Sequence, residues 1–367
     1  MFRQTGLGFG LILLLTGCAI MRPDESSPLT LRFLDEYVVP SGFIVDGMEI
    51  GGLSDLDFDD THFYTVCDLP SAPVIFQFSM PLAGNQIDTV IFEKGVPIER
   101  DSDQFPDLFF DSEGLVYHLD SDSYTLSSEG SVKNSRDPFI AELDPKGRIL
   151  GLYDLPSCFD PGKKTGPRNN GVFEGLDVAY DGDGIWAATE LPLKEDGKAP
   201  RVTGTFSPVR FTYFDRNSKK ATRQFAYPLD RLRKFPLLPY GINGVTAILE
   251  YEENQFLVLE RGFSAGYGKH GFRVLLYHAD ARNADSTLDI HQLKNHKRDL
   301  SLARKQLLFD FNSIRKKLSR RSVDNLEGMA LGPRLPNGNR TLVLIADNNF
   351  NRIMPQMNQI ILLEIVE

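Results

Sequence analysis

Acidic residues come in pairs along this sequence, and each pair flanks two short apolar runs. The clearest pair lies in NGVFEGLDVAYDGDGIWAATE at 170–190, where Glu174 precedes the first run and Glu190 follows the second. The Asp-Gly-Asp-Gly turn supplies the positive φ values that tight hairpins need, so the segment predicts a β-hairpin. The start of the first strand and the end of the second share one edge of a hairpin, which brings the two glutamates together. Carboxylates gathered there could bind a hard cation such as calcium, or exchange protons during hydrolysis.

The same pattern occurs five times. The other hairpins are expected at 52–68, 112–129, 243–261 and 325–348. The first strands of the five hairpins begin at Asp55, Glu113, Glu174, Thr246 and Glu327. Further strand-like runs, such as PVIFQF and PFIAELD, follow the hairpins. Strand-only units repeated at intervals of 58 to 81 residues have the length of four-stranded propeller blades with their loops.

The sequence therefore predicts an all-β fold, a β-propeller with five visible four-stranded blades, while a sixth blade stays open as an alternative. The last unit contains only three strands, and RFLDEYVV at 32–39 can supply the fourth and close the ring. A β-sandwich also has many short strands, but sandwiches rarely repeat one acidic hairpin at blade-length intervals. The single segment that resembles a helix is NSIRKKLSRR at 312–321.

Radial repetition should gather the acids around one mouth of a central channel. Many carboxylates in a site of low dielectric raise one another's pKa unless a cation compensates, and calcium is the simplest remedy. The predicted calcium ligands are Asp55, Glu113, Glu174, Glu260, Glu327 and Asp347. The carboxylates predicted to act in catalysis are Glu174, Glu190 and Glu327. The alternative is that the acids accept hydrogen bonds from neighbouring blades and hold no ion.

Basic residues beside the acidic strand ends could bind a small anionic substrate or ligand. The candidates are Arg168, Arg261, Lys269 and Arg352. Arginine grips phosphate or carboxylate through paired hydrogen bonds, although each of these residues could instead pair with a neighbouring acid. No Ser-His-Asp set at recognisable spacing is present, so covalent catalysis has no support. His118 could be a general base or a hydrogen-bonded structural histidine.

The composition and the first residues of the chain limit its partners and the compartment in which it acts. A formal net charge of −10 over 367 residues argues against nucleic-acid binding, which needs a basic surface. Residues 1–17 have the layout of a signal peptide, and LTGC at 15–18 resembles a bacterial lipobox with Cys18 as the lipidated residue. Residues 18–30 then form a polar tether, and 31–367 form one domain. We expect an exported monomer, held on the periplasmic side or at the outer membrane by its lipid anchor alone. Cys67 and Cys158 could pair or stay free.

Several stretches resemble the phytase-like family described as having "esterase-like activity of phytase". They are GGLSDLDFD at 51–59, DSEGL at 111–115, the segment 171–190, FLVLERGF at 256–263 and the segment 323–351. The resemblance implies a calcium-dependent phosphoesterase whose carboxylates hold the ion and position a phosphate for attack by water. It implies that the ion and water ligands are Asp55, Glu113, Glu174, Glu190, Glu260, Glu327 and Asp347. The sequence departs from this pattern at Thr246, and it lacks a phosphate pocket dense in lysine and arginine of the kind that a hexaphosphate would favour.

Three functional interpretations follow from these residues. The first is an exported hydrolase of phosphate esters that uses calcium and an activated water. The second is a non-enzymatic propeller in which calcium adds rigidity and the surface binds a ligand or a protein. The third is a lactonase or carboxylesterase with a similar calcium site.

Overall fold

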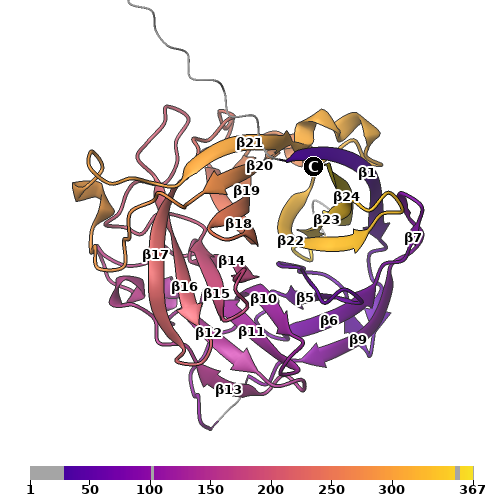
Figure 1. Ribbon diagram of the computed structural model, residues 1–367, viewed down its shortest axis with the longest axis horizontal. Coiled ribbons are helices and arrows are strands. Elements are labelled where there is room, and N and C mark those ends of the chain that lie inside the picture. Colours follow the sequence, from indigo (N-terminus) through magenta and orange to yellow (C-terminus); the bar gives the residue numbers. More distant parts are fainter. Residues whose placement is uncertain (1–28, 101–102, 352–355, 367) are drawn as a thin grey trace, which may run out of the picture.

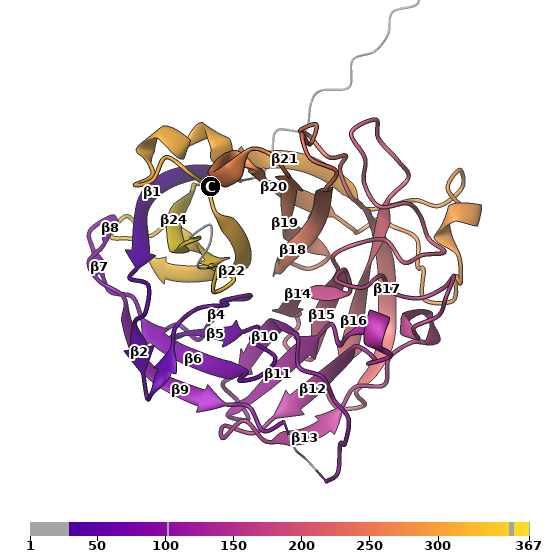
Figure 2. The same ribbon diagram turned by 180° about the vertical axis from the view of Figure 1, so that it is seen from behind.

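Five four-stranded antiparallel sheets are arranged around a common axis in the computed structural model of the protein (Figures 1 and 2). The structure describes residues 29–100, 103–351 and 356–366. The predicted signal peptide, Cys18 and Arg352 lie outside these residues. The fold is thus the all-β propeller that the repeats predict, with five blades rather than six.

Each blade runs from an inner strand to an outer one. Blade 1 contains β4 (Asp57–Phe58), β5 (Phe63–Cys67), β6 (Val74–Ser79) and β9 (Ile91–Pro97). Blade 2 contains β10 (Ser112–His118), β11 (Ser123–Ser128), β12 (Phe139–Leu143) and β13 (Ile149–Leu152). Blade 3 contains β14 (Phe173–Val178), β15 (Gly184–Thr189), β16 (Pro208–Asp215) and β17 (Lys220–Pro228). Blade 4 contains β18 (Gly241–Glu252), β19 (Gln255–Ser264), β20 (Phe272–Asp280) and β21 (Arg304–Asp310). Blade 5 contains β22 (Asn325–Arg334), β23 (Arg340–Asp347), β24 (Asn358–Val366) and β1 (Thr30–Val39).

The N-terminal strand closes the ring as predicted. β1 pairs antiparallel with β24, from Thr30 opposite Val366 to Val39 opposite Asn358. Strands from both ends of the described chain therefore share blade 5, and no blade is left with three strands. Two short hairpins lie outside the blades, β2 (Ile44–Val45) with β3 (Met48–Glu49) and β7 (Leu82–Ala83) with β8 (Gln86–Ile87).

The hydrophobic core is divided into five clusters, one between each pair of adjacent blades. Between blades 3 and 4, for example, Trp186 packs edge-on against Phe256. Because both faces of a blade are covered, strands such as β15 and β23 are buried almost throughout and read as continuous apolar runs. This explains why the hairpins show apolar runs rather than strict alternation.

The predicted helix at 312–321 is wrong. The structure has two 3₁₀ turns there, η5 (Phe311–Ser313) and η6 (Arg315–Lys317). Isolated helices this short are marginal in water, and the run of like charges opposes a longer one. The other 3₁₀ turns are η1 (Val132–Asn134), η2 (Ser157–Phe159), η3 (Gly268–His270) and η4 (Leu293–Asn295). Among the described residues, no helix has the length and apolar character needed to cross a membrane.

Candidate metal centre at one end of the ring

A β-bulge recurs at the start of the inner strand in blades 2 to 5. The pairing shifts by one residue between Ser112 and Gly114 in blade 2, and at the matching place in the next three blades. The extra residues on the inner strands are Glu113, Glu174, Thr246 and Glu327. Bulges re-aim side chains and are common beside functional sites. We call the end of the ring where these strands begin the rim; the strands β10, β14, β18 and β22 lie innermost there (Figure 1).

Eight carboxylates lie at the rim, and we call them the rim carboxylates. They are Asp68, Asp111, Glu113, Glu129, Glu174, Glu190, Glu327 and Asp347. The tightest group is Asp111, Glu113 and Glu129, whose oxygens all lie within 4.8 Å of one another. Asp111 and Glu113 are two positions apart at the start of β10, and Glu129 follows β11 beside them. The prediction that hairpin geometry brings such acids together is confirmed for this blade.

Burial and mutual repulsion raise the pKa of the rim carboxylates. Burial raises the pKa of Glu113 and of Glu174 well above the ordinary glutamate value, and neighbouring carboxylates raise it further. Burial is also the main cause that raises the pKa of Asp68 and of Glu129 to about 8. The pKa of Asp111 rises to about 6, although the charge of Lys133 opposes the effect of burial. The site therefore holds more negative charge than the protein around it compensates.

Hydrogen bonding is uneven among these groups. Glu129 Oε1 accepts from the backbone N–H groups of Gly171 and Val172 in the loop before β14, at 2.6 and 2.5 Å. Asp347 accepts from the Asn349 N–H at 2.6 Å and from the Asn325 amide at 3.2 Å. Within the described part of the chain, no side-chain or backbone donor contacts the carboxylates of Glu113 and Glu174. The Asp111 carboxylate also has no donor among the described residues, so these three are the groups that a bound cation would satisfy.

Arg261 is the one basic residue hydrogen-bonded to the rim carboxylates in the described chain. Its guanidinium donates to Glu190 Oε1 at 3.3 Å, to Asn325 Oδ1 at 2.8 Å, and to Glu327. Burial lowers its pKa, but the charges of Glu174 and Glu190 outweigh this and hold the pKa above the ordinary arginine value. The residue thus lies at the predicted site. Its contacts, however, are with carboxylates of the protein itself.

The pairing register explains how Arg261 comes to the rim and why Glu260 does not. Arg261 lies opposite Gly244, as Asp347 lies opposite Asn325 in blade 5, so the two occupy equivalent positions. Glu260 lies one residue earlier and therefore points to the other side of the strand. Its carboxylate accepts from Tyr227 Oη at 2.7 Å and Asn243 Nδ2 at 2.9 Å, and pairs with Lys305 at 2.5 Å. The structure does not bring Glu260 into the rim group.

Asp55 lies outside the rim group as well. Its Oδ1 accepts from the Leu56 N–H and its Oδ2 from the Leu115 N–H of blade 2, both at 2.8 Å. After burial, the charges that raise its pKa are those of Asp57 and Asp177, which are not rim carboxylates. Asp57 and Asp177 bridge blades in the same way, to the N–H groups of Tyr117 and Glu250. Asp55 therefore links blades 1 and 2 through hydrogen bonds, as the alternative prediction states.

The other predicted anion-binding residues lie apart from the rim carboxylates. Arg168 donates to the backbone carbonyls of Pro192 and Gly197 at 2.9 and 2.8 Å, so it fixes the loop after β15. Lys269 is exposed and donates to the Arg320 carbonyl at 3.2 Å. His118 is buried with Nε2 2.8 Å from Thr125 Oγ1, and burial lowers its pKa to about 4. Cys67 and Cys158 are free thiols.

Asp111 is a rim residue that sequence reasoning missed, and Asp68 and Glu129 were not among the predicted ligands or catalytic residues. Residues two apart on a strand face the same side, so Asp111 could have been found from Glu113. Asn325 stands in the same relation to Glu327, and its amide donates to Glu327 Oε1 at 2.9 Å. The signal was therefore present as a two-residue alternation at the bulges of blades 2 and 5.

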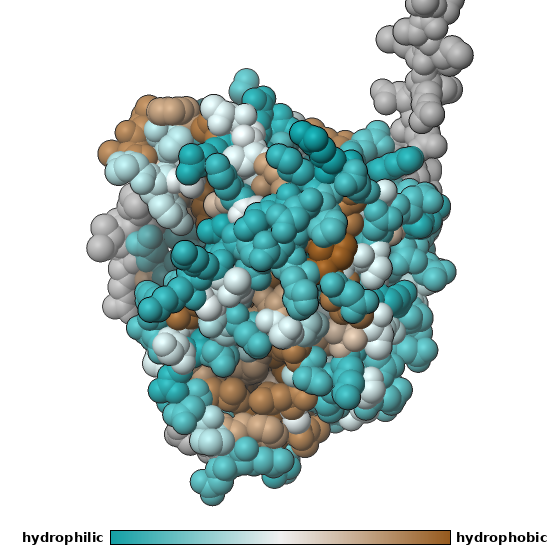
Figure 3. Space-filling model, turned by 90° about the vertical axis from the view of Figure 1, so that its left-hand side faces the viewer, coloured by the Kyte–Doolittle hydropathy of each residue, from teal (hydrophilic) through white to brown (hydrophobic). Residues whose placement is uncertain are grey.

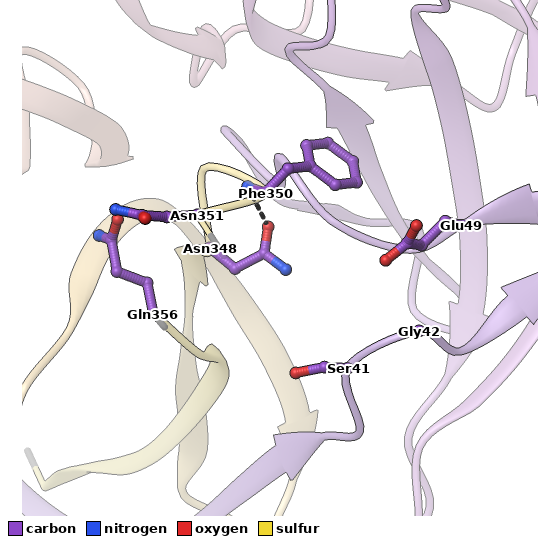
Figure 4. A pocket seen from close by; sticks show the side chains of 7 residues that line it. All are labelled: Ser41, Gly42, Glu49, Asn348, Phe350, Asn351 and Gln356. Carbon is purple, nitrogen blue, oxygen red and sulfur yellow. Dashed lines mark hydrogen bonds between the residues drawn. The ribbon is translucent and has the colours of Figure 1, made fainter. Parts of the chain in front are cut away.

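A cavity of about 420 Å³ adjoins the rim beside Asp347. Asn348, Asn351 and Gln356 line one side of it, and Ser41 and Glu49 line the other (Figure 4). Asn348 Oδ1 accepts from the N–H groups of Gly52 and Phe350, which fixes the amide in this wall. The cavity offers amide, hydroxyl and carboxylate groups to a polar ligand.

The donor set at the rim fits calcium. Calcium binds six to eight oxygens from carboxylates, amides and water, and it tolerates irregular geometry. Asp111, Glu113 and Glu129 are three carboxylates within reach of one ion, and Glu113 has no other partner in the described chain. No histidine or cysteine belongs to this group, which disfavours zinc and copper. Calcium itself stays a prediction.

The stability of the calcium-free protein should fall as pH rises. The pKa of Glu129 and of Asp68 is about 8 in the folded protein, against ordinary values near 4 in an unfolded chain. Between these values the folded state binds protons that the unfolded state lacks, so the free energy of unfolding decreases with pH. We expect a lower melting temperature at about pH 8 than at about pH 5 in chelator, and a much weaker dependence with calcium. Thermal unfolding at both pH values, with and without calcium, measures this; equal slopes in the two conditions would contradict it.

Comparison with known proteins finds a sequence relative, several solved structures and a protein family. A secreted protein of unknown role from Arthroderma benhamiae is 22% identical over 229 residues, which are 54% of this chain and 45% of that protein. The chain thus spans about half the length of this relative. Among solved structures, Myxococcus xanthus glutaminyl cyclase (9% identity, TM-score 0.40) and the Podospora anserina α-L-arabinofuranosidase PaAbf62A (9%, 0.43) each align over 92% of this chain and 98% of their own. The sequence matches the phytase-like family, described as "esterase-like activity of phytase", over residues 48–350. Because this match covers most of the chain, the protein belongs to the phytase-like family.

Proposed function

We propose that the protein is a calcium-dependent hydrolase of phosphate esters whose reaction takes place at the rim. The observation that carries the proposal is the group of carboxylates gathered at the rim, of which Asp111, Glu113 and Glu174 have no side-chain hydrogen-bond partner in the described chain. Membership of the phytase-like family supports the reaction class. When bound, calcium would polarise a phosphoryl oxygen and lower the pKa of a water molecule.

The residues that would hold the ion are Asp111, Glu113 and Glu129. Glu129 is already oriented by the Gly171 and Val172 N–H groups, so part of its reorganisation is complete before binding. Glu174 is buried beside them, and its raised pKa suits a carboxyl group that takes and returns a proton during the reaction. Arg261 acts as a positioning residue because it holds Glu190 and Glu327 in place.

The phosphate of a substrate needs cations that are not already paired. Lys133 and Lys163 line a second pocket of about 420 Å³, next to the loops that flank Glu129, together with Lys194, which donates to the Gly162 carbonyl at 2.6 Å. The charge of Lys133 reaches the metal group, since it lowers the pKa of Asp111. Asn169 Oδ1 accepts from the Lys133 N–H at 3.0 Å and so joins the two loops of this pocket. We assign the anionic part of the substrate to this pocket.

Purified protein should hydrolyse phosphomonoesters or phytate with calcium and stop when calcium is chelated. Lys133→Ala should raise KM about 10-fold or more with little change in kcat, because it removes a contact made equally to substrate and transition state. Lys94→Ala, an exposed lysine on β9, is the matched control. A phenyl ester and a lactone in the same assay test the carboxylesterase and lactonase alternatives. Calcium-independent turnover, or none on any phosphate ester, would refute the proposal.

A non-catalytic propeller stabilised by calcium is the second candidate. The contacts of Arg261 favour it, because this guanidinium is occupied by Glu190 and Glu327, and Thr246 replaces an acid in blade 4. In this case calcium would raise the melting temperature and no ester would be turned over. The assay above, run beside thermal unfolding, separates the two candidates.

We also propose that the protein is exported and lipidated at Cys18. The apolar run and the lipobox-like LTGC support export, and the relative from Arthroderma benhamiae is named as a secreted protein. Labelling with a palmitate analogue should depend on Cys18.

A further inference from the structure

A short loop before β18 exposes four large apolar side chains. The side chains of Phe235, Leu237, Leu238 and Tyr240 are 70%, 64%, 59% and 57% exposed. In the rest of the described chain, no stretch of six residues exposes more than two large apolar side chains. The side of the molecule drawn in Figure 3 is largely hydrophilic, with its apolar groups in a few patches. Concentrated apolar surface of this kind usually marks an interaction site.

The loop is held rigidly in this exposed position. The Leu237 and Leu238 N–H groups donate to the Ala265 carbonyl at 2.9 and 3.2 Å, and the Ala265 N–H donates to the Tyr240 carbonyl at 3.0 Å. Tyr267 Oη donates to the Phe235 carbonyl at 2.9 Å. Two prolines, Pro236 and Pro239, restrict the backbone further. The apolar side chains are therefore presented outward by a fixed scaffold, and they cannot fold back into the core.

Three segments with only basic charge surround these side chains. They are 231–240, the loop 264–271 after β19, and 311–321, which includes η5 and η6. Together they contain nine lysines and arginines and no aspartate or glutamate: Arg231, Arg233, Lys234, Lys269, Arg315, Lys316, Lys317, Arg320 and Arg321. The whole chain has the opposite balance, with 50 acids against 40 basic residues.

Direct contacts join the segments into one surface. Lys234 Nζ donates to the His270 carbonyl at 2.9 Å, and Lys269 Nζ donates to the Arg320 carbonyl at 3.2 Å. After burial, the charge of Arg315 lowers the pKa of both Lys234 and His270, so the cations repel one another. Of the acids at the margins, Asp230 pairs with Arg233 and Asp310 pairs with Arg273. Lys316, Lys317, Arg320 and Arg321 are exposed, whereas Arg315 is half-buried.

We propose that this surface docks onto an anionic lipid bilayer, with the loop 235–240 entering the interface and the surrounding lysines and arginines contacting lipid phosphates. Charge complementarity selects this partner, because a basic residue near an anionic membrane surface strengthens binding about five-fold. Aromatic side chains such as Phe235 and Tyr240 suit the boundary between headgroups and acyl chains. The surface lies on the rim side of the ring, since the charges of Glu190 and Arg261 affect the pKa of Tyr240.

A tryptophan placed in the loop reports this docking locally. The chain contains one tryptophan, Trp186, which is buried, so its emission should stay constant. In a full-length Cys18→Ser protein, Phe235→Trp should shift its emission to shorter wavelength with vesicles containing phosphatidylglycerol. Phosphatidylcholine vesicles should give no shift. Tyr180→Trp, 61% exposed in the β14–β15 turn away from the rim, is the matched control and should not respond to either vesicle.

Charge removal tests the second half of the proposal. Combining Lys316→Gln, Lys317→Gln and Arg320→Gln with the Phe235→Trp reporter should weaken binding to anionic vesicles roughly 100-fold. An unchanged emission, an equal shift with neutral vesicles, or an unchanged affinity after charge removal would overturn the proposal. A shift that depends on protein concentration without lipid would also overturn it, and would assign the surface to a second copy of the chain.

Discussion

The variant Glu113→Gln is expected to lose calcium binding and turnover while its calcium-free form becomes more stable than the native protein near pH 8. Glu113 is half-buried beside four other carboxylates that raise its pKa, and the described chain offers it no donor. Its charge is therefore a cost to the folded state unless an ion is present. Loss of groups that merely support a metal ligand already weakens binding 10- to 100-fold, so we expect a loss of at least about 100-fold. Isothermal titration with calcium and thermal unfolding in chelator measure the two effects.

Asp55→Asn is the matched control for this experiment. It also replaces a buried carboxylate by its amide near the start of an inner strand, but Asp55 accepts hydrogen bonds from Leu56 and Leu115. An amide supplies one acceptor oxygen in place of two, so one N–H is left unsatisfied at a cost of about 1–3 kcal/mol. We expect Asp55→Asn to be less stable and to keep its calcium affinity. If both variants lost calcium equally, the distinction between rim and interblade acids would be wrong.

Arg261→Met should produce the largest loss of stability at the rim. The substitution keeps an apolar stem and removes the charge that pairs with Glu190 and Glu327. Breaking a buried ion pair by removing one partner costs about 3–5 kcal/mol. We expect the loss to be greatest near pH 8 in chelator and to be reduced by calcium or by lower pH, because both neutralise the stranded carboxylates. Thermal unfolding across pH with and without calcium tests this.

Arg210→Met serves as its control. Arg210 is fully buried in β16 and pairs with Asp196 at 2.7 Å, far from any group of unpaired acids. Its loss should destabilise the protein by a similar amount that calcium does not change. If calcium also left the stability loss of Arg261→Met unchanged, the prediction that Arg261 neutralises the calcium-binding carboxylates would be wrong.

The sequence predicted the fold and the convergence of acids because both follow from repetition. Five acidic hairpins at blade-length intervals allow few architectures, and the fourth strand of blade 5 was identifiable from its position before the first hairpin. Glu113, Glu174, Glu190, Glu327 and Asp347 reach the rim as expected. Their roles as ligands or catalytic groups stay predictions.

The misplaced residues fall into two groups with different physical causes. Successive residues of a strand face opposite sides of the sheet. An error of one position in the expected register therefore places Glu260 at the rim, where the structure has Arg261. The bulges add a residue to each inner strand, and nothing in the sequence marks their exact place. The predicted positions of Arg168 and Lys269 were wrong for another reason. Both residues lie in loops whose paths depend on contacts with other loops. Sequence spacing alone does not encode those contacts.

The pairing of β1 with β24 has a consequence for how the molecule is made. β1 is the first strand of the domain to leave the ribosome, and its partner β24 is the last. Until β24 arrives, β1 has an exposed edge that could pair with another chain. Ring closure also depends on the contact of greatest sequence separation, which makes it intrinsically slow. We therefore infer that the ring of a newly made molecule stays open until β24 pairs with β1. A protein truncated within β24 should then be prone to aggregation.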